Sequence, residues 1–258
     1  MHRAAKKATD MANHPEHPDH PQDTPRVVSL DQARAQQRER AQVRSLSAND
    51  EYQPILRLPP MIKTLCALIL VIFAVQQLLP PDLADALVWW GGFIPARYSG
   101  VLPFDAAALW SPFSHALLHG GWMHIGMNIG MLMAFGAGIE KQRGAKSLLV
   151  IFVASTLGGA LTQFVFYSDS TMPMIGASGG ISGLFGAALM EMAQHATHHD
   201  PRWRTRLRHV LPFVAVWIGI SLFFGIFGMP GENQPVAWAA HVGGFIAGMI
   251  AASWRPRA

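Results

Sequence analysis

The stretch Gly176-Ala177-Ser178-Gly179, continued by the mostly apolar residues 180–192, places a serine hydroxyl at the start of a segment long enough to cross a bilayer. A second apolar segment carries His241 near its start, in the stretch Ala240-His241-Val242-Gly243-Gly244. Polar side chains are unfavourable inside lipid, so a serine and a histidine placed there indicate a function. A hydroxyl beside an imidazole is an arrangement typical of nucleophilic catalysis.

Half of the 258 residues are hydrophobic and only 14% are charged, whereas a soluble domain averages about 25% charged residues. A membrane-spanning helix needs roughly 17–25 mostly apolar residues. Six stretches reach this length: residues 61–79, 116–135, 146–166, 176–192, 210–229 and 236–254. The sequence therefore predicts an all-α membrane protein built as a bundle of six transmembrane helices.

Lysine and arginine are concentrated in alternate connections between these stretches. Most of them lie in the N-terminal arm, in residues 141–146 and 202–208, and at Arg255 and Arg257, and Arg97 is the only one between the first two spans. The positive-inside rule then places both termini in the cytoplasm, with Ser178 and His241 near the outer ends of their helices. Because topology explains the basic residues and no basic patch is interleaved with aromatic side chains, we expect no nucleic-acid partner.

Residues 1–55 differ in composition from the rest of the chain. They are rich in His and Pro up to residue 25 and in Gln and Arg afterwards, with few aromatic residues. Such a segment cannot bury enough apolar surface to fold alone, so we expect a disordered cytosolic arm before a membrane domain at residues 56–255. Its Pro-spaced histidines, His14, His17 and His20, lack zinc-finger spacing, which favours an inert tail over a metal site.

Residues 80–113 form the longest connection between predicted spans. They are apolar but interrupted by glycine and proline, at Gly91, Gly92, Pro95, Gly100, Pro103 and Pro112. Irregular backbone at membrane depth is tolerated only against protein or water. With Trp89, Trp90, Tyr98 and Trp110 as interfacial aromatic residues, we expect a partly embedded loop at the membrane surface.

The second predicted span begins with a polar cluster of His115, His119, His124 and Asn128. A helical zinc protease would show His-Glu-x-x-His, whereas Ala-Leu-Leu separates His115 from His119 and no carboxylate is near. A metal site is therefore disfavoured. His124 and Asn128 are four residues apart and share a helix face, where their N–H groups could stabilise a developing oxyanion.

Small residues follow one face of each of two spans. On the fourth span this face carries Ser178, Ser182 and Gly186, and on the sixth it carries His241, Gly244 and Gly248. Small residues along a transmembrane face allow close helix contact. If these two faces meet, the Ser178 hydroxyl comes within hydrogen-bond reach of the His241 ring, as a catalytic dyad requires.

Three motifs, at residues 115–128, 176–179 and 240–244, resemble in this order those of the rhomboid intramembrane serine proteases. The resemblance covers residues 55–255. It implies that Ser178 is the nucleophile, that His241 is the general base, and that His124, Asn128 and the Ser178 backbone N–H form the oxyanion hole. It also implies that residues 80–113 match the family's embedded first loop, and that Glu140 and Arg143 have a structural role.

One position departs from the family's pattern. Rhomboid proteases commonly carry an aromatic residue four positions after the nucleophile, where it stacks on the catalytic histidine, and here this position is Ser182. We therefore expect Phe185 or another aromatic side chain to support the His241 ring, or the ring to be held more loosely.

The resemblance implies an intramembrane serine endopeptidase that cleaves transmembrane segments of membrane proteins, in a bacterial inner membrane and without a cofactor. Its partners would be those substrates and the lipid bilayer. The alternative is a catalytically silent rhomboid-like protein that binds transmembrane clients, although both Ser178 and His241 are present. A transporter with a histidine proton relay would carry acidic residues within its spans, whereas Asp and Glu lie at span ends or in loops.

Hydrolysis at this depth needs water. We therefore expect an outward-facing polar cavity beneath residues 168–175 and 230–235.

Overall fold

The computed structural model describes residue 29 and residues 33–40, 58–196, 203–228 and 236–254. The chain divides into two units, residues 1–55 and 56–258. In the first unit the described part is residue 29 and a short helix over residues 33–40. The remainder of the predicted disordered arm lies outside the described residues.

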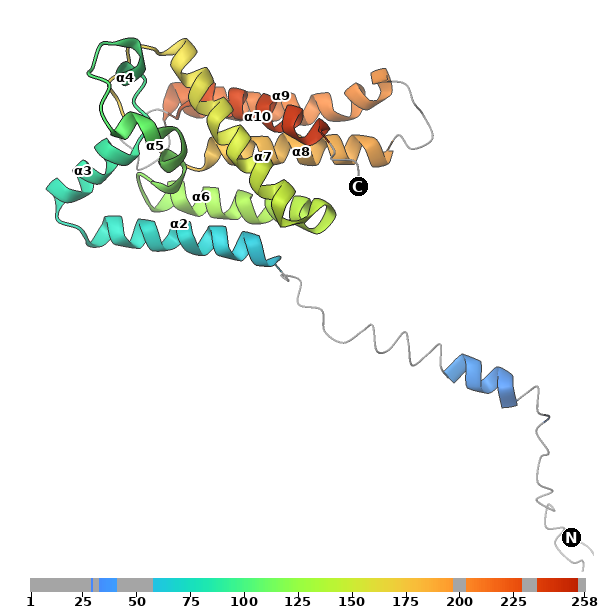
Figure 1. Cartoon of the computed structure of the whole chain (residues 1–258). Coiled ribbons are helices and arrows are strands. Elements are labelled where there is room, and N and C mark those ends of the chain that lie inside the picture. Colours follow the sequence, from blue (N-terminus) through green and yellow to red (C-terminus); the bar gives the residue numbers. More distant parts are fainter. Residues whose placement is uncertain (1–28, 30–32, 41–57, 197–202, 229–235, 255–258) are drawn as a thin grey trace, which may run out of the picture. The chain divides into compact units, whose positions relative to one another are not determined.

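Every regular element in the described residues of the second unit is a helix (Figure 1). The helices are α2 (Pro60–Leu78), α3 (Pro81–Gly91), α4 (Ala96–Ser99), α5 (Ala107–Ser114), the 3-10 turn η1 (His115–Leu117), α6 (Trp122–Met131), the π-helical turn η2 (Leu132–Gly136), α7 (Ala137–Phe166), α8 (Ser178–Ala196), α9 (Trp203–Phe227) and α10 (Trp238–Ser253).

Three helical segments among the described residues are long and apolar enough to cross a membrane. They are Pro60–Leu78, Trp122–Phe166 and Val210–Phe227, and Trp238–Ser253 is apolar but shorter. The second of them holds the predicted second and third spans, separated by a kink at Gly144, whose φ is +80°. The structure is thus that of an all-α membrane protein, while the count of six spans stays a prediction.

The helix expected from residue 116 begins later, at Trp122. The backbone leaves helical geometry at Leu118, with ψ of 147°, and is extended at Gly121, with φ of −172°. Glycine loses more conformational freedom in a helix than any other residue, so the Gly120-Gly121 pair favours a break here. The break separates His115 and His119 from the helix that carries His124 and Asn128.

Glycines bring α7, α8 and α10 into close contact at the centre of the second unit. A Cβ at Gly244 of α10 would overlap the backbone oxygen of Gly179 in α8, and one at Gly248 would overlap the backbone of Gly183. On the other side of α10, a Cβ at Gly159 of α7 would lie 2.8 Å from Ala240 O. Helix backbones can approach this closely only where side chains are missing. These contacts fix α10 against both neighbours.

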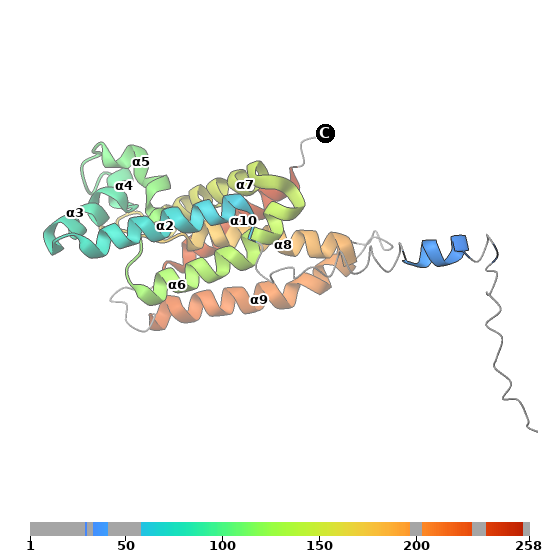
Figure 2. The same cartoon turned by 90° about the horizontal axis from the view of Figure 1, so that it is seen from below.

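Helix α9 lies at the edge of this unit in both views (Figures 1 and 2). Its apolar side chains are largely exposed, among them Phe213, Val216, Phe223 and Phe227. On a membrane protein, exposed apolar side chains can contact the lipid chains. α9 therefore presents most of its surface outward and meets the other helices along a narrow face.

Glu140 of α7 holds the start of α2. Its two carboxylate oxygens accept hydrogen bonds from the backbone N–H groups of Met61 and Ile62, each at 2.9 Å. The first N–H groups of a helix have no partner within the helix, so this carboxylate satisfies two of them and complements the helix dipole. Further along α7, Arg143 pairs with Glu191 of α8, with 2.7 Å between Nε and Oε1. Glu140 and Arg143 thus have the structural contacts expected of them.

We predict that Glu140→Gln destabilises the protein by about 2 kcal/mol, because hydrogen bonds to a charged group are the stronger kind and the amide keeps only one acceptor oxygen. Thermal unfolding in detergent measures this loss. Lys141→Gln, which removes an exposed charge at the next position, is the matched control and should unfold as the wild type does. An unchanged melting temperature for Glu140→Gln would contradict the role assigned to the carboxylate.

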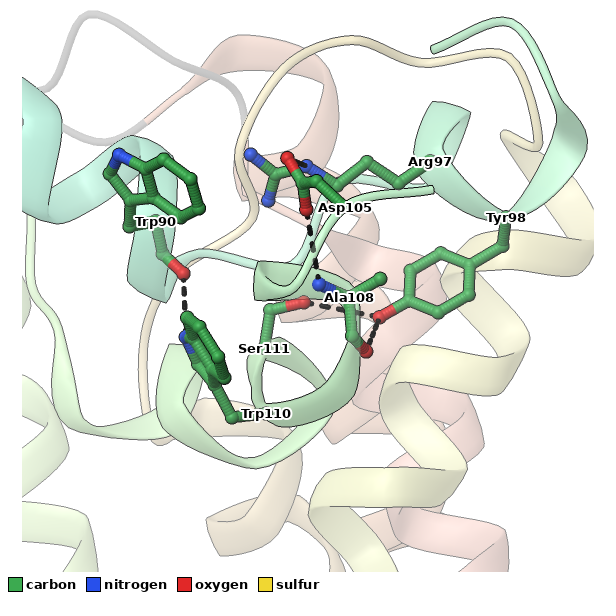
Figure 3. Close-up of polar contacts among 7 residues, drawn as sticks. All are labelled: Trp90, Arg97, Tyr98, Asp105, Ala108, Trp110 and Ser111. Atoms are coloured by element: carbon green, nitrogen blue, oxygen red, sulfur yellow. Dashed lines mark hydrogen bonds and ion pairs between the residues drawn. The ribbon is translucent and has the colours of Figure 1, made fainter. Parts of the chain in front are cut away.

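The segment between α2 and α6 is folded around a buried arginine. Arg97 is only 1% exposed, and its Nε lies 3.3 Å from Asp105 Oδ2 (Figure 3). The guanidinium also lies over the ring of Trp89, 5.0 Å from the ring centroid. A cation placed there gains from both the carboxylate and the aromatic face. Arg97 therefore joins α3, α4 and the start of α5.

Two aromatic side chains complete this segment. The Tyr98 hydroxyl donates to Ala108 O at 2.7 Å and lies 3.1 Å from Ser111 Oγ, while Trp110 Nε1 donates to Trp90 O at 2.9 Å (Figure 3). Burial raises the pKa of the Tyr98 phenol, which keeps it a neutral donor. The predicted irregular loop is thus three short helices held by their own side chains.

Candidate active site

The turn before α8 is held by the segment between α3 and α4 and by η1. Phe93 and Met174 exchange backbone hydrogen bonds of 2.9 and 2.8 Å, and the Gly176 N–H donates to His115 O at 2.8 Å. Gly176 has a φ of +117°, which favours glycine. A Cβ there would also lie 2.6 Å from His124 Nε2. The positive φ and the nearness of His124 therefore both favour glycine two residues before Ser178.

A cavity of about 530 Å³ opens beside this turn. Its polar lining includes side chains from five helices, α6 to α10, and one from η1. They are His115, His124, Asn128, Gln163, Ser178, Ser221 and His241. Residues 172–176 also line it, as expected of a cavity beneath residues 168–175. The other expected border, residues 230–235, lies outside the described residues. Ser178, His241, His124 and Asn128 thus face one cavity.

Ser178 is the first residue of α8. Its carbonyl accepts a hydrogen bond from Ser182 Oγ at 2.7 Å, and the preceding Ala177 carbonyl accepts from the Ile181 N–H at 3.0 Å. N–H groups in the first turn of a helix have no intrahelical acceptor and carry the positive end of the helix dipole. The Ser178 backbone can therefore donate a hydrogen bond to a group bound beside its own hydroxyl.

His241 lies in the first turn of α10 and is held from α9. Its Nδ1 is 3.2 Å from Ser221 Oγ. Trp217, one turn earlier on α9, is the aromatic ring beside it, with centroids 6.4 Å apart and planes inclined by 41°. Phe185 packs on Trp217 instead, at 4.9 Å. Trp217 of α9 thus lies beside the His241 ring, whereas Ser182 of α8, where an aromatic residue is common in the family, carries no ring.

The expected hydrogen bond between the two catalytic candidates is absent from the described residues. His241 Nε2 is buried and has no hydrogen-bond partner among the described residues, so the Ser178–His241 bond is not formed in this structure. Catalytic hydrogen bonds are often long before substrate binds. The α8 face that meets α10 includes the predicted Gly186, but its other close contacts are Gly179 and Gly183, one residue away from the predicted Ser178 and Ser182. Only glycines permit this approach.

His124 and Asn128 share one face of α6, as predicted. The Gly120 N–H is 3.5 Å from His124 Nδ1 and donates to it, and Asn128 Nδ2 donates to His124 O at 2.9 Å. In a neutral imidazole only one nitrogen carries hydrogen, so acceptance at Nδ1 leaves the hydrogen on Nε2, the atom beside Gly176. His124 can therefore act as a hydrogen-bond donor close to Ser178.

The other two histidines of the cluster have different surroundings. His115 is buried and lines the cavity, whereas His119 is buried against α2, where Gln76 exchanges hydrogen bonds of 3.2 and 3.3 Å with its backbone. Among the described residues, no group of three or more His, Cys, Asp or Glu side chains could hold a metal ion.

Ser221 was not among the predicted site residues. The available signal was a hydroxyl within an apolar stretch, one helical turn after Trp217. This signal is weak because a serine on a transmembrane helix commonly serves packing alone.

The family model of the rhomboid domain matches residues 106–256, which is more than half of the chain. The chain belongs to the rhomboid family. The rhomboid domain and the apolar helices together make it an integral membrane protein.

Rhomboid relatives occur in animals and bacteria. Rhomboid-related protein 2 of Mus musculus is 30% identical over 54% of this chain and 46% of its own length. Rhomboid protease GlpG of Pectobacterium atrosepticum is 32% identical over 57% of this chain and 48% of its own length. The same protease of Serratia proteamaculans is 29% identical over 77% of this chain and 63% of its own length. This rhomboid chain thus spans about half the length of the first two.

Proposed function

We propose that this rhomboid protein is an intramembrane serine endopeptidase that cleaves transmembrane segments of membrane proteins. The observation that carries the proposal is the cavity lined by Ser178, His241, His124 and Asn128. A nucleophile, a base and two donors around one space are the parts that acyl transfer requires. The rhomboid proteases among the relatives support the same reaction.

In the proposed reaction His241 Nε2 takes the proton of the Ser178 hydroxyl while Oγ attacks the peptide carbonyl carbon. The negative charge that develops on the carbonyl oxygen is stabilised by His124, by Asn128 and by the Ser178 backbone N–H. His241 then gives the proton to the leaving amine. Water, activated by the same ring, hydrolyses the acyl-enzyme and restores Ser178.

The proposed substrate class follows from the chemistry of a helical peptide bond. A peptide bond within a helix is shielded by the hydrogen bonds of that helix, so cleavage requires local unwinding. Glycine and proline destabilise a helix interior. We propose transmembrane segments with such residues near the cleavage point as substrates.

We also propose six membrane spans, with α8 as the fourth and both termini in the cytoplasm of a bacterial inner membrane. The basic residues Lys141, Arg143 and Lys146 near the start of α7 support this orientation under the positive-inside rule.

A fluorophosphonate probe tests the proposed function. Purified wild-type protein in detergent should be labelled covalently, and peptide mapping should locate the adduct on Ser178. In liposomes the same protein should cleave a model transmembrane substrate that carries a Gly-Pro pair. Folded protein that is neither labelled nor able to cleave would favour the silent client-binding alternative.

Asn128→Ala tests the proposed oxyanion donors. We expect kcat for the transmembrane substrate to fall about 10²-fold with little change in KM, since the lost donor acts on charge that develops only in the transition state. Met123→Ala, at an exposed position of the same helix, should retain wild-type kinetics. Equal kcat values for Asn128→Ala and wild type would remove Asn128 from the mechanism.

A further inference from the structure

The helix at the edge of the unit reaches the cavity with a polar side chain. Among the described side chains of α9, Ser221 is the only buried one, with 4% of its surface exposed. Its Oγ is 3.2 Å from His241 Nδ1. A buried hydroxyl without a partner is destabilising, and the contact with His241 gives this one a partner. This buried hydroxyl of α9 therefore meets the ring that shares the cavity with Ser178.

We propose that Ser221 is a positioning residue for His241, and that α9 thereby supplies the third member of a Ser178–His241–Ser221 relay. The inference rests on the proposed function, because it assigns a role to the base of that reaction. Nothing in the sequence pattern that predicts Ser178 and His241 requires a hydroxyl at residue 221.

The chemistry of imidazole explains the role. A neutral histidine acts as a base through the nitrogen that lacks hydrogen, and the bond made by the other nitrogen decides which one that is. In the proposed arrangement the Nδ1–H donates to Ser221 Oγ, 3.2 Å away, and the lone pair is then on Nε2. Nε2 is buried and has no hydrogen-bond partner among the described residues. When Nε2 takes the serine proton, the same Nδ1–H bond becomes charge-assisted and stronger.

Rotation of the ring is restricted by the same helix. Trp217 and Ser221 are four residues apart on α9 and so lie on one face. The Trp217 ring lies beside the imidazole, and Ser221 fixes one edge of it. A hydroxyl is neutral, so it orients His241 without adding a charge inside the membrane.

The test measures the rate at which the fluorophosphonate probe labels Ser178 in wild type, Ser221→Ala and Ser221→Thr. We expect Ser221→Ala to be labelled about 10-fold more slowly, as the loss of one hydrogen bond to a group that becomes charged predicts. Ser221→Thr, which keeps the hydroxyl, should recover to within about three-fold of wild type. With a transmembrane substrate, kcat should fall in Ser221→Ala while KM stays unchanged.

Ser253→Ala is the matched control, since its hydroxyl bonds to Ile250 O within α10. Melting temperatures show which variants are folded, and Ser221→Cys replaces the alanine if that variant does not fold. Wild-type labelling in Ser221→Ala, faster labelling in it, or equal loss in alanine and threonine would overturn the positioning role. Absence of labelling in wild type would instead overturn the proposed function, so the two failures are distinct.

Discussion

Ser178→Ala is expected to abolish fluorophosphonate labelling and to lower cleavage of a transmembrane substrate by at least about 10⁴-fold, because the variant lacks the hydroxyl that forms the acyl-enzyme in the proposed reaction. Ser178 is the hydroxyl at the start of α8 that shares the cavity with His241. His241→Ala should have an effect of similar size, since residues that act as one unit lose their contribution together. The double variant should then be no slower than either single one.

Folding controls separate this result from collapse of the site. Ser178 is only half-buried, so Ser178→Ala should keep a melting temperature close to that of the wild type. His241→Ala leaves the buried Ser221 hydroxyl without its partner, so we expect a lower melting temperature but still a cooperative transition. Ser253→Ala should be labelled at the wild-type rate. If Ser178→Ala still cleaved substrate, the reaction would belong to another nucleophile. If His241→Ala were labelled at the wild-type rate, Ser178 would be activated by another group.

The site residues that belong to short sequence motifs could be predicted from the sequence. Ser178, His241, His124 and Asn128 line one cavity, and the helical turn that joins His124 to Asn128 is visible as a four-residue spacing. Glycines at the helix contact were predicted as well. Period and residue type are local properties, so both can be recognised without knowledge of the packing.

The contacts that depend on how the helices pack were not predicted. The contact line on α8 follows Gly179 and Gly183 because only a missing Cβ lets Gly244 and Gly248 approach, and this offset of one residue cannot be seen from spacing alone. The contact of Ser221 with His241 joins residues 20 positions apart on two helices. Likewise, Trp217 lies beside His241 from a different helix than the one on which an aromatic residue was expected.

Gly244→Ala is predicted to destabilise the protein and to reduce labelling of Ser178 together. The new Cβ would overlap Gly179 O and lie 2.8 Å from Gly179 C, and backbone atoms cannot rotate away as a side chain can. α10 would have to move away from α8, and His241 would move with it. A displacement on the order of 1 Å can cost about 10²-fold in rate, and we expect a loss of that size.

The direction of the stability change in Gly244→Ala shows whether the α8–α10 contact or the helix propensity of alanine dominates. Within a helix, Gly→Ala is by itself favourable by roughly 0.5–1 kcal/mol, so propensity alone predicts that Gly244→Ala stabilises the protein. Gly130→Ala in α6 is the matched control, since its Cβ would meet no described atom within 4 Å. This control should melt at or above the wild-type temperature and be labelled normally. A Gly244→Ala protein as stable and as reactive as the control would mean that the α8–α10 contact does not set the position of His241.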